Sequence, residues 1–242
     1  MYGILCATPE ELAALQARLS VEPEAKRHGP TRVRLGHHRG RDLALAQAGI
    51  GKVNAAAAAT LLLSADGATT LIFSGVAGGL NPDLTVGSVL LGERLGIHDY
   101  GIVTGRQFTP TAYGVIPIGA PRLAAAPPVS PGVRAKLAAL RDAMRGRLGH
   151  PVELGTILTA DYFLNCAETR DELRTAFSAD AVDMESGAVN QVASAWGVPL
   201  YVIRTLSDLA GDDSHLSYTE LVGMAAENSA ACVIGLLEML EG

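Results

Sequence analysis

Three carboxylates lie at or just past the ends of apolar, strand-like runs: Glu11, Glu185 and Asp208. Ligands of parallel α/β sheets bind beyond the carboxyl ends of the strands, so the fold could bring all three into one crevice. Carboxyl groups in different environments can divide acid and base duties. Cleavage of an N-glycosidic bond needs such a set: an acid for the departing base, a carboxylate that activates water, and hydrogen bonds to the sugar.

Each of these carboxylates also has a purely structural explanation. Thr8, Pro9 and Glu11 match the start of a helix with a capping box, in which the glutamate accepts from the backbone of the cap residue. Glu185 opens a helical pattern, where a negative charge favours the helix dipole. Asp208 could shape a loop. The local sequence leaves both explanations open for all three residues.

The elements that would position these residues alternate between strands and helices. Apolar or alternating runs predict strands at 2–7, 32–38, 42–48, 70–74, 87–95, 152–159, 181–184 and 199–206. Helical spacing follows Thr8 and recurs at 55–63, 133–148, 168–177, 185–196 and 221–240. This alternation predicts an α/β layered fold with a largely parallel sheet.

Two glycine-rich or proline-rich segments interrupt this pattern. We expect the strand at 70–74 to break at Gly75–Gly79, where the backbone could approach a ligand or a neighbouring strand. Residues 100–131 carry many Pro and Gly residues without a sustained period. Long structureless loops are uncommon in compact domains, so we expect this excursion to serve a site or a subunit contact.

Composition limits the class of protein. A chain of 242 residues with 48% hydrophobic side chains can bury a substantial core, and we expect one domain over 1–242. The net charge is -6 and the sequence has no long run of one sign, so it does not predict a basic surface for nucleic acid or an anionic membrane. A small neutral or zwitterionic substrate fits better.

The three cysteines are too few and too far apart for a disulfide framework or a zinc site, which indicates a reducing compartment. The N-terminal residues lack the basic region of a secretory signal, and no uninterrupted apolar run approaches the ~18 residues that span a bilayer. We therefore expect a cytoplasmic protein that contacts neither membrane nor nucleic acid.

No bound metal or cofactor is expected. Neither His37–His38 nor His98–Asp99 has a metal-binding companion at helical spacing. Gly49–Ala55 superficially matches a dinucleotide fingerprint, but Asn54 stands in place of its third glycine. Phe163 is one of four phenylalanines and lies in a loop after a strand; it could contact a ligand or pack in the core.

Together, several segments resemble the methylthioadenosine/S-adenosylhomocysteine nucleosidases of the purine nucleoside phosphorylase superfamily, and the resemblance spans nearly the whole chain. The matching segments are Ala7–Glu11, Gly49–Ala55, Gly75–Leu80, Asp183–Glu185 and Arg204–Asp208 with Ser214–Ser217. The resemblance implies a nucleoside phosphorylase-like fold, a three-layer α/β/α sandwich with a mixed, largely parallel central sheet. It also implies a homodimer whose partner chain closes the pocket.

The resemblance implies roles for matched residues. Glu11 would activate the attacking water, helped by Arg204, and Asp208, steadied by Ser207, would protonate adenine at N7. Glu185 would hold the ribose hydroxyls. The other matched positions would contact the purine nucleoside: Met184 at the sugar, Phe163 and Leu164 at the base, Ile50 and Tyr218 at the 5′-alkylthio pocket, and Val76, Ala77 and Gly78 along the glycine-rich segment.

The implied reaction is hydrolysis of methylthioadenosine and S-adenosylhomocysteine to adenine and the thioribose. Val76 stands where many family members carry Ser or Thr, so one hydrogen bond is missing there. Phosphorylases of the superfamily carry a phosphate-binding loop where this chain has Thr8–Glu11, and a carboxylate there would repel phosphate. Alternatives are a futalosine or aminodeoxyfutalosine nucleosidase, a purine nucleoside phosphorylase, and a catalytically silent nucleoside-binding or interaction protein.

Overall fold

A computed structural model describes residues 1–240 of the chain. The strands of its main sheet are β1 (Tyr2–Cys6), β2 (Ser20–Val21), β3 (Lys26–His28), β4 (Thr31–His38), β5 (Arg41–Gln47), β6 (Thr70–Gly79), β7 (Val89–Ile97), β10 (Val152–Thr159), β11 (Ala181–Asp183) and β12 (Leu200–Asp208). The helices are α1 (Pro9–Gln16), α2 (Lys52–Ser64), α3 (Pro131–Met144), α4 (Ala167–Phe177), α5 (Ser186–Trp196) and α6 (Ser214–Leu240).

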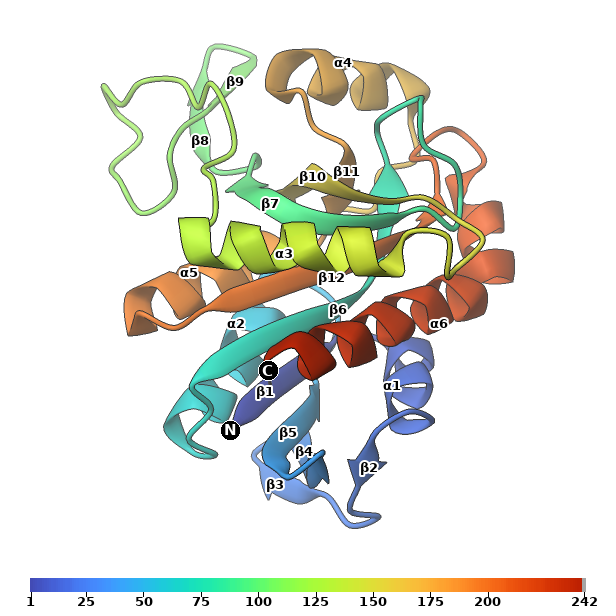
Figure 1. Cartoon of the computed structure of the whole chain (residues 1–242). Helices are drawn as coiled ribbons and strands as arrows, with labels where there is room; N and C mark the ends of the chain where they lie inside the picture. The colour runs from blue at the N-terminus through green and yellow to red at the C-terminus, as the bar shows by residue number, and fades with distance from the viewer. Residues whose placement is uncertain (241–242) are drawn as a thin grey trace.

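The sheet has ten strands in the order β11-β10-β7-β12-β6-β1-β5-β4-β2, with β3 paired to β4. The neighbours β5, β1, β6 and β12 run parallel, as do β7, β10 and β11, whereas β12 and β7 are antiparallel. Helices α1, α3 and α6 pack on one face, and α2 and α5 on the other (Figure 1). The prediction of an α/β/α sandwich with a mixed, largely parallel sheet is confirmed.

Strand β11 joins one edge of this sheet to its middle, because it pairs with both β10 and β6. It runs parallel to β10 but also pairs antiparallel with the end of β6, where Ala181 lies opposite Gly79 and Val182 opposite Gly78. The chain that follows β11 is thereby brought to the carboxyl end of β6. This pairing places Asp183–Glu185 beside the ends of β6 and β12.

The break expected at Gly75–Gly79 is wrong, because β6 continues to Gly79 and pairs with β12 as far as Gly78. A Cβ atom at Gly75 would collide with the guanidinium of Arg204 and the carboxylate of Glu11. The glycines therefore allow buried charged side chains to lie against the strand, and they do not end it.

Other elements also differ from the prediction, among them those of the segment 100–131 and helix α3. The excursion at 100–131 contains a hairpin of β8 (Gly101–Thr104) and β9 (Gln107–Pro110), whose four-residue strands are too short to show a period. Helix α3 begins at Pro131, capped by the Ser130 hydroxyl, and ends at Met144, short of the expected residue 148, because Arg145 leaves helical geometry at ψ 125°.

Helix α6 is long and apolar enough to cross a membrane by length and composition alone, with a mean hydropathy of 1.3 over its most apolar window. Our reading of the sequence found no such segment, because scattered polar residues interrupt every apolar run. Cys232, Val233 and Leu236 of α6 are fully buried against the sheet and its neighbouring helices. This core packing accounts for the apolar composition of the helix.

Candidate active site

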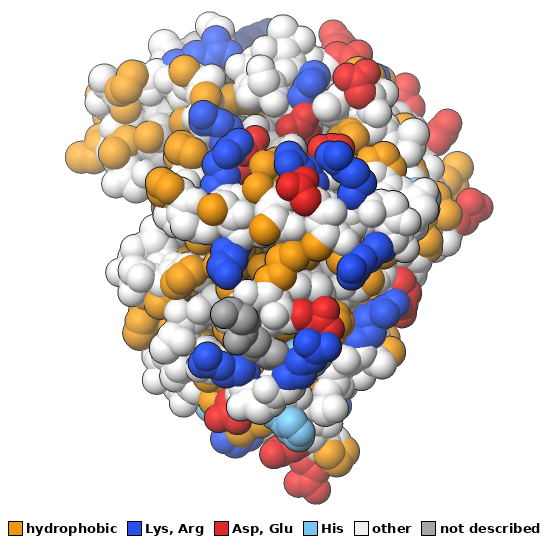
Figure 2. Space-filling view, viewed as in Figure 1, with side chains coloured by type: hydrophobic (Ala, Val, Ile, Leu, Met, Phe, Trp, Pro, Cys, Tyr) orange, Lys and Arg blue, Asp and Glu red, His pale blue; other side chains and the backbone are white. Residues whose placement is uncertain are grey.

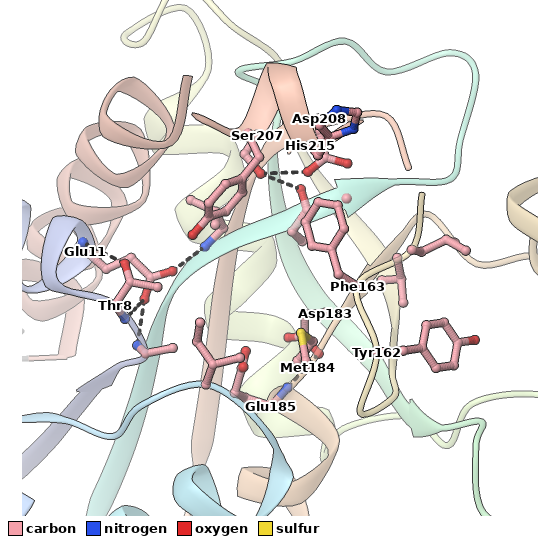
Figure 3. A pocket seen from close by; sticks show the side chains of 18 of the residues that line it. Thr8, Glu11, Tyr162, Phe163, Asp183, Met184, Glu185, Ser207, Asp208 and His215 are labelled. Atoms are coloured by element: carbon pink, nitrogen blue, oxygen red, sulfur yellow. Dashed lines mark hydrogen bonds between the residues drawn. The ribbon is translucent and has the colours of Figure 1, made fainter. Parts of the chain in front are cut away.

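A cavity of about 490 Å³ opens at the carboxyl ends of β1, β6 and β12, beside the residues that follow β11 (Figure 3). Glu11, Glu185 and Asp208 all line it. So do the other residues matched to the substrate or the acid: Ile50, Val76, Ala77, Gly78, Phe163, Leu164, Met184, Ser207 and Tyr218. Arg204 lies behind the cavity wall and is fully buried. The structure thus brings the candidate residues together, while their roles stay predictions.

Glu11 takes part in both the helix cap and the cavity. Its Oε2 accepts from the backbone N–H of Ala7 at 2.6 Å and of Thr8 at 3.1 Å, which completes the capping box of α1. Its Oε1 reaches across to the N–H of Val76 at 3.0 Å. Burial raises the pKa of Glu11, and the charge of Arg204 together with these three amides opposes the rise. The carboxylate is therefore held rigidly by donors that favour its ionised form.

Arg204 is the cation behind the carboxylates. Its Nε donates to Asp183 Oδ2 at 2.9 Å, and its Nη2 donates to Glu185 Oε2 at 3.4 Å. The guanidinium carbon lies 4.0 Å from the centroid of the Phe73 ring. The charge of Arg204 opposes the rise that burial causes in the pKa of Glu11, while its expected help in activating water stays a prediction. Its direct hydrogen bonds go to Asp183, Glu185 and the Ser186 hydroxyl.

Asp183 is a site residue that our reading of the sequence did not single out. This buried carboxylate accepts from Thr159 Oγ1 at 2.6 Å, from the N–H and hydroxyl of Ser186, and from Arg204. It therefore fixes the arginine that faces Glu185. Its position in the matched segment Asp183–Glu185, directly after a buried strand, was the available indication.

Glu185 stands at the N-cap of α5, yet its carboxylate makes no capping hydrogen bond. Its Oε1 accepts from the N–H of Gly51 at 2.9 Å, and the side chain faces the cavity (Figure 3). Burial raises the pKa of Glu185 to about 7, against the lowering effect of Arg204 and with a further rise from Asp183. The helix start alone does not explain this geometry.

Asp208 ends β12 with both carboxylate oxygens engaged. Oδ2 accepts from the Ser207 hydroxyl at 3.0 Å, and Oδ1 accepts from the N–H of Ala210 at 2.9 Å. The loop-forming explanation is therefore also satisfied. Burial raises the pKa of Asp208, although both hydrogen bonds oppose the rise. A carboxyl group with a raised pKa keeps its proton to higher pH, which suits a general acid.

An aromatic wall faces the carboxylates. Phe163 is 46% exposed, so the core-packing explanation for this residue is wrong. Its ring meets Tyr218 edge to face, with centroids 5.9 Å apart. His215 also lines the cavity and lies in the matched segment Ser214–Ser217, although no role was predicted for it. Tyr162 was not singled out from the sequence, because only the tertiary fold places it here.

The cavity has the hallmarks of a site for a small organic molecule: a concave, largely apolar wall with a few convergent polar groups. The family model described as the phosphorylase superfamily matches residues 1–238. The chain belongs to the phosphorylase superfamily. Among residues 1–240, no group of three or more His, Cys, Asp or Glu side chains is arranged to hold a metal ion.

Within the phosphorylase superfamily, this chain is 40% identical to a 5′-methylthioadenosine/S-adenosylhomocysteine nucleosidase of Mycobacterium tuberculosis, over 98% of this chain and 97% of the relative. A Helicobacter pylori nucleosidase of the same name has a solved structure with TM-score 0.85 and 27% identity, covering 98% and 97% of the two chains. A Helicobacter pylori futalosine hydrolase matches with TM-score 0.85 and 26% identity, again covering 98% and 97%.

Proposed function

We propose that this chain is a hydrolase that cleaves the N-glycosidic bond of 5′-methylthioadenosine and S-adenosylhomocysteine, releasing adenine and the corresponding thioribose. The observation that carries the proposal is the convergence of Glu11, Glu185 and Asp208 on one cavity of about 490 Å³, in a chain that resembles nucleosidases of that name over almost its full length. The volume falls within the range of small-molecule sites.

The three carboxylates divide the reaction between them. Asp208 donates a proton to N7 of adenine, so the base leaves as a neutral molecule when the bond from C1′ to N9 breaks. Glu11 accepts a proton from water as the water oxygen bonds to C1′. Glu185 accepts hydrogen bonds from the ribose hydroxyls, and its charge stabilises the positive sugar ring of the transition state. Phe163 stacks on the base, with the Leu164 backbone at its edge.

Hydrolysis is favoured over phosphorolysis by the charges around the cavity. Phosphate binding requires a free cationic side chain or a cluster of free amides. Among the described residues that line the cavity there is no lysine or arginine, and Arg204 behind it is paired with Asp183 and Glu185. The carboxylate of Glu11 would repel phosphate at the place where the nucleophile must stand.

A second candidate function is hydrolysis of futalosine or aminodeoxyfutalosine. The similarity to the Helicobacter pylori futalosine hydrolase, at TM-score 0.85, favours it. The two functions share the base and ribose contacts and differ in the group at the 5′ position. Ile50 and Tyr218, which line the cavity, are the residues of this chain matched to that region.

The proposed enzyme is a cytoplasmic homodimer with one nucleosidase domain over 1–242, of which 241–242 lie outside the described residues. Figure 2 shows hydrophobic side chains gathered at the upper left, where Figure 1 draws β8 and β9. The exposed large apolar side chains of residues 100–131 are Val103, Phe108, Tyr113, Val115, Ile116 and Ile118. A large exposed apolar patch is typical of an interface, which supports a partner chain at this place.

The three free cysteines are consistent with a reducing compartment.

Purified protein incubated with methylthioadenosine, S-adenosylhomocysteine, inosine and aminodeoxyfutalosine, with and without phosphate, tests the proposal. Chromatography should show adenine and the free thioribose from the first two substrates, at a rate that phosphate does not change. Faster release from aminodeoxyfutalosine would transfer the assignment to the second candidate. Release of a sugar 1-phosphate only with phosphate present would make the chain a phosphorylase, and no release from any substrate would indicate a catalytically silent protein.

A further inference from the structure

Three segments without regular structure lie in the cavity wall or next to it. The ammonium of Lys52 connects all three. The segments are 49–51, which carries Ile50; 98–99, which follows β7; and 161–164, which carries Phe163. The ammonium of Lys52 lies 2.5 Å from Asp99 Oδ1 and 3.4 Å from Asp161 Oδ2. We refer to Lys52, Asp99 and Asp161 as the lysine clamp.

Backbone hydrogen bonds reinforce the lysine clamp. The N-cap of α2 is Gly51, which has no side chain to offer and lies at φ 98°. Asp161 supplies the missing cap from a distant part of the chain, because its Oδ1 accepts from the N–H of Lys52 at 2.9 Å. The N–H of Asp161 in turn donates to Asp99 Oδ2 at 2.8 Å. Each carboxylate thus binds both a charge and an amide.

Helix preference does not explain a lysine at this position. A cation in the first turn of a helix is opposed by the helix dipole, so Lys52 is unfavourable for α2 by itself. The side chains of Lys52 and Asp99 are only 18% and 21% exposed, which reduces the screening by water that makes most surface ion pairs weak. The negative charges of Asp99 and Asp161 offset the unfavourable position of the Lys52 charge, and the Lys52 charge in turn stabilises the two carboxylates.

The lysine clamp is connected to the proposed ribose contact through Gly51 and to the proposed base contact through Asp161. The N–H of Gly51, next to Lys52, donates to Glu185 Oε1 at 2.9 Å. Asp161 lies two residues before Phe163, whose ring is 46% exposed in the cavity wall. Displacement of either segment would therefore move a group that contacts the nucleoside.

We propose that Lys52 is a positioning residue for nucleoside binding, which holds the Glu185 partner Gly51 and the Phe163 loop in register through Asp99 and Asp161. The inference rests on the proposed function for the identity of the ligand. Lys52 touches no reacting atom, so it acts on the affinity for substrate more than on the chemical step.

Steady-state kinetics of Lys52→Met with methylthioadenosine test this role. Loss of uniform binding raises KM without an equal fall in kcat, and we expect KM to rise roughly tenfold while kcat changes less. Lys52→Arg keeps the charge and should recover most of the affinity. Lys136→Met is the matched control, because Lys136 is exposed and, among residues 1–240, donates to the Met239 carbonyl alone, at 3.1 Å; its KM should equal that of the wild type.

A destabilised helix could produce a similar defect, so Ala58→Gly in the middle of α2 serves as a second control. It weakens the helix without touching the lysine clamp. If Ala58→Gly lowers Tm as much as Lys52→Met and raises KM equally, or if Lys52→Met leaves KM unchanged, the positioning role is wrong. Wild-type protein that releases no adenine would instead refute the proposed function.

A double-mutant cycle and a binding measurement complete the test. Lys52→Met with Asp99→Asn should raise KM no more than Lys52→Met alone, because both changes remove the same ion pair; additive effects would contradict the clamp. Calorimetric titration with adenine reports the Phe163 loop without turnover. Adenine should bind more weakly to Lys52→Met than to Lys136→Met, and equal affinity would overturn the link to the base site.

Discussion

At the scale of single residues, the site reuses groups that the fold needs for other reasons. Glu11 closes the capping box of α1 with Oε2 and faces Val76 with Oε1. Asp208 closes a turn onto Ala210 and lines the cavity. Local contacts of this kind restrict the rotamers of the side chain, so a carboxylate that is also a structural anchor is already oriented for chemistry.

Asp208→Asn should abolish adenine release while the protein stays folded. The amide oxygen can still accept from the N–H of Ala210, but the neutral amide cannot deliver a proton, and loss of a general acid costs roughly 10²- to 10⁴-fold in rate. The measurement is kcat with methylthioadenosine, beside thermal unfolding. Ser207→Ala loses one hydrogen bond to Asp208, and its kcat should lie between those of Asp208→Asn and the wild type. Normal turnover by Asp208→Asn would mean that another group is the acid.

The raised pKa of Glu185 predicts that the stability of the protein depends on pH. This residue's pKa is raised from an ordinary value near 4.5 to about 7, so its contribution to stability is fully present below the unfolded value and is lost as the pH rises through about 7. Glu185→Gln does not titrate and keeps an oxygen for the N–H of Gly51. The free energy of unfolding of the wild type, relative to Glu185→Gln, should therefore fall between about pH 5 and about pH 8.

Urea unfolding of both proteins across that range makes the comparison. Other buried carboxyl groups, including Glu11 and Asp208, have raised pKa values as well. Groups that do not interact with residue 185 contribute equally to both proteins, so the difference reports Glu185 together with its interactions with Asp183 and Glu11. A difference that is constant with pH would show that Glu185 has the same pKa in the folded and unfolded chain.

At the scale of elements, the sequence predicted those that local residue types specify. Strand β10 lies at the predicted residues, Val152–Thr159, where apolar and β-branched side chains recur between Pro151 and Ala160. The hairpin of β4 and β5 turns at Arg39 and Gly40, both with positive φ, as its glycine indicates. The short hairpin within 100–131 and the extension of β6 depend on tertiary contacts, which local patterns do not encode.

The same limit applies to the site. Glu11, Glu185 and Asp208 were found because each follows an apolar run, and a family resemblance supplied their proposed roles. Asp183 and Tyr162 were missed: their importance comes from partners distant in sequence, such as Arg204 for Asp183 and His98, 2.5 Å from the Tyr162 hydroxyl. Pairings of this kind are a property of the packed sheet and its loops.

Helix α1 allows the structural and chemical roles of its first turn to be separated. Thr8→Ala removes the hydroxyl that accepts from the Glu11 N–H at 3.3 Å and should cost about 1 kcal/mol of stability. Glu11→Gln keeps one oxygen for the Ala7 and Thr8 N–H groups of the capping box but loses the acceptor for the N–H of Val76. It should stop hydrolysis yet still bind an inert nucleoside, so kcat should fall far more in Glu11→Gln than in Thr8→Ala. Equal losses of stability and binding in Glu11→Gln would support a role in capping alone.

At the scale of the whole molecule, strand order decides which residues meet. Parallel pairing of β12 with β6 sets Arg204 opposite Gly75 and Asp208 opposite Gly78, and β1 on the other side of β6 leads into Glu11. The antiparallel contact of β11 with β6 adds Glu185 from a fourth strand end. The cavity therefore belongs to the complete sheet, and no segment of two or three consecutive elements contains its chemistry.

The homodimer is the prediction that concerns the molecule as a whole. Ile116 and Ile118 are each 79% exposed, an unfavourable state for two neighbouring apolar side chains unless another surface covers them. Ile116→Glu combined with Ile118→Glu would place two charges in that interface, and burial of unpaired charges is strongly unfavourable. Sedimentation velocity should show a dimer for the wild type and a monomer for the double variant.

The activity of that variant tests whether the partner chain completes the site. If the partner closes the 5′ side of the cavity, the monomer should bind methylthioadenosine more weakly but keep its affinity for adenine, because the proposed base contacts, Phe163 and Asp208, line the cavity of one chain. Val53→Glu is the matched control, since Val53 is also 79% exposed but lies on α2, outside residues 100–131. A wild-type protein that sediments as a monomer, or a dimer that survives both charges, would remove residues 116–118 from the interface.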